Sequence, residues 1–505
     1  MLKQRVTFSL IFKIVNSLLG LISSVFVARL MGAEAMGVLS ACLAFIAIFT
    51  VFGDFGFGIA HFKRVSEGQD LGKCIGVYVR IRLVLAIVVA LVALLGYHLT
   101  FYFTGKYPID YKYYNFFLII LFSTFLTNFF SFIDMTFTAR LEVIKGSTVQ
   151  LTNRIFSVAF KSLTAVLGLA TIYLAWSSLA GVVIGTFVAV ILFRNYPIAK
   201  WDKDVFKSYL IFALPLTFVN IIETISLNID KVFISYFVSL EDVGFYSVAQ
   251  SLALLVIFPA GIITNILIPT YTNIYSKGTI AELQKFAIRI EKYLAIIIFP
   301  VVFFLFFNSR DIISLIYGNK FSPSIMIFNI LVLQGLLFIM LQPYSTQLTA
   351  MERLKAIMYI GILSQGLNIL LNFLLIPDKI GSVPLIGLGA VGSAVSLLAS
   401  TLVATIFYRS YLLKKTGLAI NYQIFIYLFI AIASTMIPAI IPWLANVILP
   451  IKLVIIFIVS AFLYLSIMWS AKLFNRDDLQ FYFEFIRVSK NVEYFRSEIN
   501  EKIIE

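Results

Sequence analysis

The chain has 505 residues, of which 61% are hydrophobic and only 13% are charged. Because a soluble globular protein carries about 25% charged residues, this composition excludes a soluble fold and predicts an all-α integral membrane protein. The net charge is +14, while two cysteines and two histidines are too few for a disulfide framework or a zinc site of standard spacing. No GxxxxGK(S/T) phosphate loop occurs, so we expect no transport driven by ATP hydrolysis within this chain. We also expect no cofactor.

Apolar segments recur along the whole chain. About 20 apolar residues cross the hydrocarbon core as a helix, and we find fourteen such segments joined by short connections. In chain order they cover residues 7–30, 36–60, 79–103, 114–139, 147–169, 171–193, 208–238, 243–270, 288–307, 324–350, 356–376, 385–408, 421–445 and 449–471.

Two further segments have the pattern of amphipathic surface helices. In the tail, 476–505, apolar residues such as Phe481, Phe485 and Val488 recur at helical spacing between charged residues. The alternative for the tail is a partner-binding or partly disordered segment. The segment Thr279–Lys292 similarly predicts a short interfacial helix that leads into the ninth span.

The distribution of lysine and arginine orients the predicted spans. If the N-terminus is cytoplasmic, 28 of the 39 cationic residues lie in cytoplasmic loops and termini, seven lie on the opposite side, and four lie inside spans. Because cytoplasmic loops carry the excess of lysine and arginine, this split predicts an even number of spans with both termini cytoplasmic. The loops then face an anionic leaflet, which accounts for the net charge without nucleic-acid binding.

The sequence contains a weak internal repeat. A shift of 207 residues lays MGAEAMGVLSA (31–41) over VSLEDVGFYSV (238–248), and a shift of 211 lays Arg154 over Gln365. Both shifts equal six spans and keep orientation, so we expect two parallel six-helix lobes around a central cavity; chance similarity is the alternative. The predicted domains are the N-lobe (1–200, spans 1–6), the C-lobe (201–410, spans 7–12), spans 13–14 (411–475) and the tail (476–505).

Polar residues inside the membrane gather on a few of the predicted helices. Such groups are costly in lipid, by roughly 2.5–3.5 kcal/mol for a central charge, and usually face a cavity. On the fifth span Arg154, Ser157 and Lys161 recur at helical spacing and form one stripe. The repeat relates this span to the eleventh, and the first span to the seventh, so the polar stripes predict one cavity between the lobes.

We assign two chemical roles to these residues. Fixed cations in a low-dielectric site can hold a phosphate or an acidic sugar, and the buried carboxylates Glu223 and Asp230 can load and release a proton or a sodium ion. The predicted substrate-binding residues are Lys13, Asn16, Arg154, Lys161, Lys231, Gln365, Asn368 and Asn372.

Structural alternatives exist for several of these residues. Lys13 and Arg154 lie near the ends of their spans, from which a long side chain can reach the interface. Asp230 and Lys231 are neighbours and can pair with each other. Outside this set, Asp54 in FGDFGFG is expected to order a turn.

One segment matches a nucleotide-binding motif but lacks the structural context that the motif requires. GLGAVG (387–392) matches the dinucleotide fingerprint GxGxxG, but an apolar helix follows it rather than a soluble βαβ unit. We therefore predict that its small residues allow close helix packing.

Several stretches, in order, resemble those of one transporter family. They are VARLMGAEAMG at the end of the first span, GDFGFGIA at the end of the second, LNIDKVFISYFVSLEDVGFYSVAQ across the seventh and eighth, LIYGNKFSPS before the tenth, and GLNILLNFLLIP with GLGAVGSAVS across the eleventh and twelfth. The chain thereby resembles the bacterial polysaccharide-repeat flippases, which are Wzx-like O-antigen, capsule and exopolysaccharide transporters. These belong to the multidrug/oligosaccharidyl-lipid/polysaccharide exporter (MOP) superfamily.

The resemblance implies a V-shaped pair of lobes that alternate access in the bacterial cytoplasmic (inner) membrane. The substrate would be an undecaprenyl-diphosphate-linked oligosaccharide, moved from the inner to the outer leaflet. Lys13, Arg154, Lys161 and Lys231 fit by position the cavity cations that engage the diphosphate or acidic sugars in that family. The implied partners are the lipid-linked oligosaccharide, membrane lipids and a polysaccharide polymerase, for example in lipopolysaccharide synthesis.

Three alternatives remain at this stage. A multidrug or small-molecule cation antiporter of the same superfamily usually has twelve spans and an acidic cavity, unlike this chain. A flippase for the cell-wall precursor lipid is a close cousin. A membrane-embedded enzyme would need an acidic metal-binding motif or a large extramembrane loop, so we expect a secondary transporter and not an enzyme.

Overall fold

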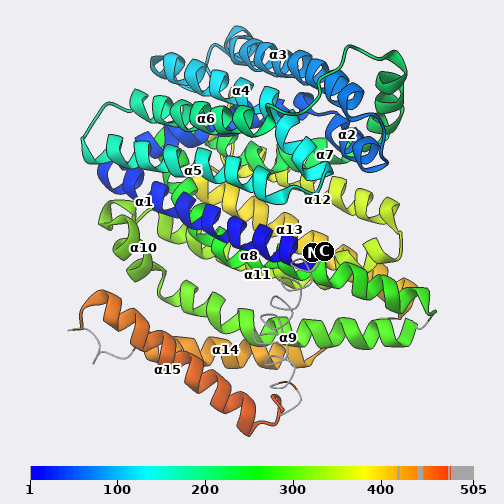
Figure 1. Ribbon diagram of the computed structural model, residues 1–505. Helices are drawn as coiled ribbons and strands as arrows, with labels where there is room; N and C mark the ends of the chain where they lie inside the picture. Colours follow the sequence, from blue (N-terminus) through cyan, green and yellow to red (C-terminus); the bar gives the residue numbers. More distant parts are fainter. Residues whose placement is uncertain (1, 279, 418–420, 441–446, 476–477, 479–505) are drawn as a thin grey trace. The chain divides into compact units, whose positions relative to one another are not determined.

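The computed structural model describes residues 2–278, 280–417, 421–440, 447–475 and 478. Within these ranges the chain is helical except for turns and one small hairpin, in which β1 (Lys379–Ile380) pairs antiparallel with β2 (Val383–Pro384) (Figure 1). The predicted tail helix, 476–505, lies outside the described residues apart from residue 478. Side chains are not described for residues 2–11, 13–14, 143, 214–224, 226–227, 258–263, 265–266 and 439–440.

The first two predicted spans share one long helix, α1 (Leu2–Phe49). Its course changes at Gly32, which has φ 87° and ψ 178°. A side chain would be strained at that positive φ, whereas glycine adopts it readily. The short helices η1 (Thr50–Gly53) and α2 (Phe57–Ser66) complete the second apolar segment.

The other twelve predicted segments each fall on one helix. In chain order these are α3 (Leu71–Thr104), α4 (Tyr114–Ala139), α5 (Val143–Val166), α6 (Ile172–Phe193), α7 (Lys203–Phe237), α8 (Leu240–Ser276), α9 (Ile280–Phe307), α11 (Ser324–Ala350), α12 (Leu354–Leu375), α13 (Gly389–Thr416), α14 (Gln423–Ile440) and α15 (Leu449–Ser470).

Shorter helices lie in the connections. They are η2 (Tyr111–Tyr113), α10 (Ser309–Tyr317) and η3 (Asn319–Phe321). The interfacial helix that was expected to lead into the ninth span is the first part of α9, with no break between the two. The two merge because no glycine or proline separates them.

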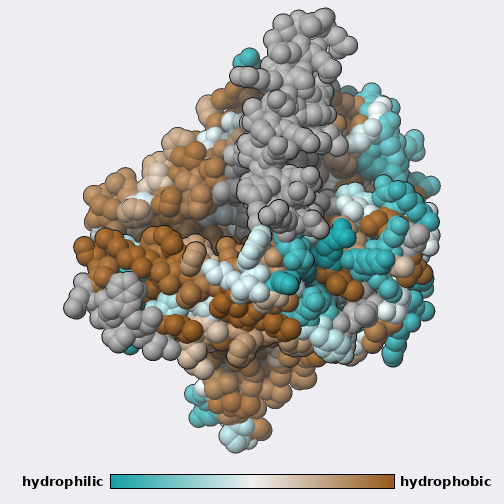
Figure 2. All heavy atoms as spheres, turned by 90° about the horizontal axis from the view of Figure 1, so that it is seen from below, coloured by the Kyte–Doolittle hydropathy of each residue, from teal (hydrophilic) through white to brown (hydrophobic). Residues whose placement is uncertain are grey.

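The described helices are suited to a bilayer. Ten of the helical segments searched within the described residues are long and apolar enough to cross a membrane. Helix α5 is not among these ten because its polar stripe lowers its mean hydropathy. The apolar stretch of α14 is not among them because it is shorter than a span requires. Large hydrophobic side chains such as Leu91 and Phe187 are exposed, and Figure 2 shows hydrophobic residues over broad areas of the face drawn. The chain is a multi-pass, all-helical membrane protein.

The chain divides into two compact units, each described by itself. The larger unit comprises Phe8–Leu252 and Gly361–Ser400, and the smaller comprises Met1–Thr7, Ala253–Ile360 and Thr401–Glu505. The expected lobes, 1–200 and 201–410, stay a prediction.

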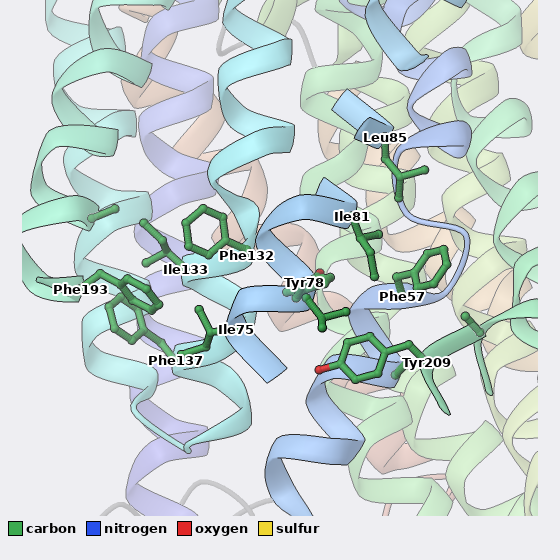
Figure 3. Close-up of a cluster of buried hydrophobic side chains, with 14 residues drawn as sticks. Phe57, Ile75, Tyr78, Ile81, Leu85, Phe132, Ile133, Phe137, Phe193 and Tyr209 are labelled. Carbon is green, nitrogen blue, oxygen red and sulfur yellow. The ribbon is translucent and has the colours of Figure 1, made fainter. Parts of the chain in front are cut away.

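An aromatic core holds the larger unit together. Figure 3 shows Phe132 and Phe137 of α4 gathered with Phe193 of α6. Tyr78 of α3 and Tyr209 of α7 belong to the same cluster and are fully buried. Burying such a side chain stabilises the fold by about 1.5–3 kcal/mol, so this cluster fixes how α3, α4, α6 and α7 pack.

Asp54 has the structural role expected of it. Its Oδ1 accepts a hydrogen bond from the Gly58 backbone N–H at 3.0 Å and forms an ion pair with Arg82 Nη2 at 2.6 Å. The buried Arg82 side chain also donates to the Gly53 carbonyl at 2.6 Å and to the Tyr78 hydroxyl at 2.8 Å. The motif around Asp54 therefore anchors the turn after η1 to α3.

Two glycines allow α1 and α8 to approach closely. A Cβ atom at Gly37 would lie 1.6 Å from the Leu240 carbonyl oxygen, and one at Gly244 would lie 2.0 Å from the Ala33 carbonyl oxygen. The 207-residue shift carries Ala33 onto Leu240 and Gly37 onto Gly244. The two contacts are therefore equivalent, because each glycine faces the residue that the shift relates to the other glycine's contact. Any side chain at either glycine would force the helices apart.

The GLGAVG segment has the packing role predicted from the sequence. A Cβ atom at Gly392 would lie 2.6 Å from the Leu375 carbonyl oxygen, so α12 and α13 approach closely there. Gly387 has φ 70°, in the left-handed region, and faces Asp378.

In the smaller unit, a buried ion pair joins three helices. The Arg409 guanidinium of α13 donates to the buried Glu291 carboxylate of α9 and, at 2.9 Å, to the Tyr344 hydroxyl of α11. A second ion pair, between Lys452 and Asp311 at 2.7 Å, ties α15 to α10. These contacts have structural roles.

Candidate functional site

The polar stripe predicted on α5 divides into residues that hold α6 and residues that do not. Thr164 and Ser177 of α6 share a hydrogen bond of 3.0 Å. Ser157 packs on Gly181, where a Cβ atom would lie 2.7 Å from the Ser157 Cβ. These hydroxyl residues attach α5 to α6, so they serve helix packing.

The two cations of the stripe, Arg154 and Lys161, are not used in this way. Lys161 is only 9% exposed, and it has no hydrogen bond or ion pair with any residue that the structure describes. The two positions are seven residues apart, about 10 Å along the helix. Among the described residues, α5 thus presents two positive charges without a carboxylate partner.

Arg154 reaches the first helix. Its Nη2 lies where a Cβ atom of Gly20 would be, at 2.2 Å, so the guanidinium rests on the α1 backbone because that position is glycine. The Arg154 Nε is buried without a hydrogen-bond partner in the described chain, as is the Asn16 Oδ1 one turn before Gly20. The structure therefore brings the predicted residue Arg154 to the helix that carries Asn16 and Lys13.

An acidic network lies elsewhere in the larger unit. Asp230 of α7 is 3% exposed. Its Oδ2 accepts a hydrogen bond from the Tyr246 hydroxyl at 3.0 Å, and its Oδ1 accepts one from Asn372 Nδ2 at 2.6 Å. Asn372 Nδ2 also donates to Asn368 Oδ1 at 3.3 Å. Three predicted site residues, on α7 and α12, thus meet around one carboxylate.

Several polar atoms of this network are still free to bind. Asn372 Oδ1 and Asn368 Nδ2 are buried and lack a hydrogen-bond partner among the described residues, and the buried Ser393 hydroxyl lies beside the Asp230 carboxylate. A carboxylate with amide and hydroxyl oxygens nearby is the ligand set that hard cations prefer. A carboxylate in such a site can alternatively carry a proton. The site could therefore hold either ion.

The charges of Asp230 and Lys231 attract each other, but the two side chains do not form a direct ion pair. Asp230 is held by Tyr246 and Asn372, and Lys231 makes no ion pair within the described part of the chain. Gln365 contributes a buried Oε1 without a partner in that same part.

Two predicted residues cannot be placed in the same way. The side chains of Lys13 on α1 and Glu223 on α7 lie outside the described residues. Their roles stay predictions.

The sequence reasoning missed a second group of polar residues. A cavity of about 630 Å³ is lined by Tyr107, Tyr111 and Lys112 of the α3–α4 connection together with Glu34 and Glu241. The signal was present in the tyrosine-rich stretch YHLTFYFTGKYPIDYKYYNFF (97–117), which covers the connection between two predicted spans and the span ends on either side of it.

Comparison with known proteins identifies the family. Residues 26–326, more than half of the chain, match the family model described as "Polysaccharide biosynthesis protein". This chain belongs to that family. One relative of this chain is "Teichuronic acid biosynthesis protein TuaB" of Bacillus subtilis (strain 168), 24% identical over 166 residues. The aligned part is 32% of this chain and 34% of TuaB, so the likeness spans about a third of that relative.

Solved structures show the same fold. One is "Lipid II flippase MurJ, inward closed conformation", with a TM-score of 0.70, 15% identity, and coverage of 93% of this chain and 100% of that one. Another is an inward-facing "multidrug resistance MATE family transporter of the MOP superfamily", with a TM-score of 0.62, 15% identity, and coverage of 80% and 96%. At this identity the likeness concerns the fold. The chain therefore has a fold like that of MOP-superfamily transporters.

Proposed function

We propose that the chain is a flippase that moves a polyprenyl-diphosphate-linked oligosaccharide from the inner to the outer leaflet of the bacterial cytoplasmic membrane. The observation that carries this proposal is the pair of α5 cations, Arg154 and Lys161, which lack a carboxylate partner in the described chain. A membrane protein tolerates such charges mainly where they face a cavity or a ligand. Together with membership of a polysaccharide biosynthesis family, they favour an anionic, sugar-bearing lipid.

The proposed architecture follows from the same reasoning. Fourteen spans form two parallel six-helix lobes and two extra helices, and both termini are cytoplasmic. The head of the substrate enters a V-shaped cavity between the lobes while its polyprenyl tail stays in lipid. Rocking of the lobes then exposes the cavity to the other side, as in alternating access.

An ion gradient drives the cycle in this proposal. Binding of a proton or sodium ion at Asp230 neutralises a carboxylate that is otherwise held by Tyr246 and Asn372. The ion favours one conformation only if it binds that conformation more tightly. The unpartnered oxygen of Asn372 and the hydroxyl of Ser393 supply additional ligands for a bound cation.

The decisive experiment measures the lipid-linked pool in a deletion strain. The gene is deleted in its host with all glycosyltransferases intact, and undecaprenyl-diphosphate oligosaccharides are extracted and identified by mass spectrometry. We expect a complete repeat unit to accumulate and to disappear when the intact gene is restored. An unchanged pool combined with increased sensitivity to cationic drugs would instead favour a multidrug antiporter.

A further inference from the structure

The cavity missed by the sequence reasoning lies at the ends of helices in the larger unit. Its walls come from the α3–α4 connection, the part of α1 just after Gly32, and the turn between α7 and α8. The count of cationic residues places Lys106 and Lys112, and with them this cavity, on the outer side of the membrane. Its volume of about 630 Å³ falls within the range of about 300–1,000 Å³ that is typical of ligand sites.

One wall of the cavity is aromatic and rigid. Tyr107 stacks on Phe101, with ring centroids 4.2 Å apart and planes at 11°, and also on the buried Tyr97 at 4.9 Å. Tyr111 stacks on Tyr114 at 5.4 Å and keeps 58% of its surface exposed. These rings are supported from behind, so a ligand that packs on Tyr111 finds a surface already ordered.

The rest of the cavity lining is charged, with both signs present. The Glu34 carboxylate forms an ion pair with Lys112 at 2.8 Å and accepts a hydrogen bond from the Tyr113 hydroxyl at 2.9 Å. Asp110 and Glu241 add two further carboxylates to the lining. Glu241 is exposed and makes no hydrogen bond or ion pair within the described chain.

The base of the cavity is held in place by backbone contacts. Ser235 Oγ donates to the Pro108 carbonyl at 2.7 Å, and Lys106 Nζ donates to the Tyr236 carbonyl. The close contact of Leu240 with Gly37 lies at the same turn. The α3–α4 connection is thus tied to the end of α7, and the lining does not need to be assembled by a ligand.

We propose that this cavity binds a saccharide on the outer side of the membrane, as an exit subsite for the translocated oligosaccharide. A pyranose ring offers C–H groups for packing on a tyrosine face and hydroxyl groups for carboxylates and ammonium groups, which form strong charge-assisted hydrogen bonds. Three carboxylates beside two lysines disfavour a free phosphate or an anionic lipid head, and the charges disfavour an apolar drug. The inference rests on the proposed flippase function, because that function supplies sugars at this face.

Binding to the purified full-length protein in lipid nanodiscs tests the inference. The probe is the lipid-free oligosaccharide mixture obtained by mild acid hydrolysis of the host's own surface polysaccharide, and saturation-transfer NMR and calorimetry measure its binding. We expect Tyr111→Ala to weaken binding by about tenfold, which corresponds to about 1.4 kcal/mol, because it removes the exposed aromatic face on which a sugar ring packs. Tyr102→Ala is the matched control, because Tyr102 is 80% exposed on the neighbouring end of α3 and does not line the cavity.

A second variant covers the case in which Tyr111→Ala does not fold. Glu241→Gln preserves shape and removes only the charge of a residue without a described partner, and we expect it to weaken binding by about threefold to tenfold. Absence of binding to the unaltered protein, or equal binding by Tyr111→Ala and Tyr102→Ala, would overturn the inference.

The two proposals can fail separately. If the deletion strain accumulates the repeat unit but the purified protein does not bind the probe, the flippase stands and the exit subsite is wrong. If Tyr111→Ala loses binding while the lipid-linked pool of the deletion strain is unchanged, the cavity binds sugar and the flippase proposal is wrong.

Discussion

Lys161 is a buried ammonium group on α5 that no carboxylate in the described chain neutralises. Replacing it with alanine removes a hydrogen-bond donor whose contact with an anionic ligand contributes about 1.5–3 kcal/mol. We therefore predict that Lys161→Ala lowers the rate of export by about tenfold to a hundredfold with normal protein levels. Export is measured as outer-leaflet appearance of the lipid-linked oligosaccharide in membrane vesicles.

Two controls define this prediction. Lys161→Arg should restore much of the rate because it keeps the charge, and Lys200→Ala, at an exposed position between α6 and α7, should export normally. Full export by Lys161→Ala, by Arg154→Ala and by the double variant would disprove the cationic cavity.

Asp230 gives a prediction of a different kind. Asp230→Asn keeps a side chain of the same shape between Tyr246 and Asn372 but cannot take up a proton or balance a cation. We expect slow export that no longer responds when the proton or sodium gradient is collapsed by an ionophore. An Asp230→Asn protein whose rate still rises with the gradient would exclude this residue from coupling.

For the candidate site, the sequence predicted which residues belong to it better than it predicted which of them contact each other. It singled out Asp230, Asn368 and Asn372, but it could not show that they meet, because contacts between α7 and α12 join positions more than 130 residues apart. It grouped Ser157 with Lys161 by spacing. Spacing alone cannot distinguish a hydroxyl that packs on α6 from a cation that does not.

Helix α6 depends on glycine where it meets α5. A Cβ atom at Gly181 would lie 2.8 Å from the Asn153 carbonyl oxygen and 2.7 Å from the Ser157 Cβ. Gly181→Ala therefore overpacks the contact and should destabilise the protein by about 1–3 kcal/mol. Gly366→Ala on α12 is the matched control, since nothing lies within 4 Å of its added Cβ, and it should be neutral or stabilising by up to about 1 kcal/mol. Melting midpoints in detergent that fall equally for both variants would contradict this account.

The connection between α4 and α5 contains a cluster that responds to pH. Glu142 forms ion pairs with Lys145 at 2.7 Å and Arg140 at 3.0 Å and accepts a hydrogen bond from the Tyr196 hydroxyl. Partial burial raises the pKa of the Glu142 carboxyl, but the contacts with Lys145 and Tyr196 outweigh it and hold the pKa below its ordinary value of 4.5.

A lowered pKa in the folded state means that the cluster stabilises the protein above the unfolded pKa and loses this effect as the pH falls through the folded pKa. Glu142→Gln should therefore cost about 0.5–1 kcal/mol at neutral pH. The difference in melting midpoint from the unaltered protein should shrink towards zero below about pH 4. A difference that is constant over this range would show that the Glu142 charge is not responsible.

At the level of single helices, the length of each apolar segment was enough to predict where most of the helices lie. Twelve of the fourteen apolar segments each fall on one helix in the described part of the chain, because a run of about 20 apolar residues has few other stable structures in lipid. The first two segments join in α1 because Gly32 bends the helix without ending it. Hydrophobic length does not reveal such a bend, nor the uninterrupted start of α9.

The predicted topology can be tested on the whole molecule. Both native cysteines, Cys42 and Cys74, are fully buried, so the background of thiol labelling should be low. A membrane-impermeant maleimide added to intact cells should label Lys379→Cys, at the exposed β1 strand, but not Lys200→Cys. Labelling of both in lysed cells is the control, and the reverse pattern in intact cells would invert the topology.

The reciprocal contact of α1 and α8 bears on how such a chain could have arisen. Gly37 faces Leu240 in the same way that Gly244 faces Ala33, and the 207-residue shift exchanges the two pairs. In a symmetric dimer each subunit contributes the same patch in this reciprocal manner. A shorter ancestral chain carrying one copy of this glycine could thus have paired with itself before its gene was duplicated and fused. No new surface would then have been required when two subunits became one.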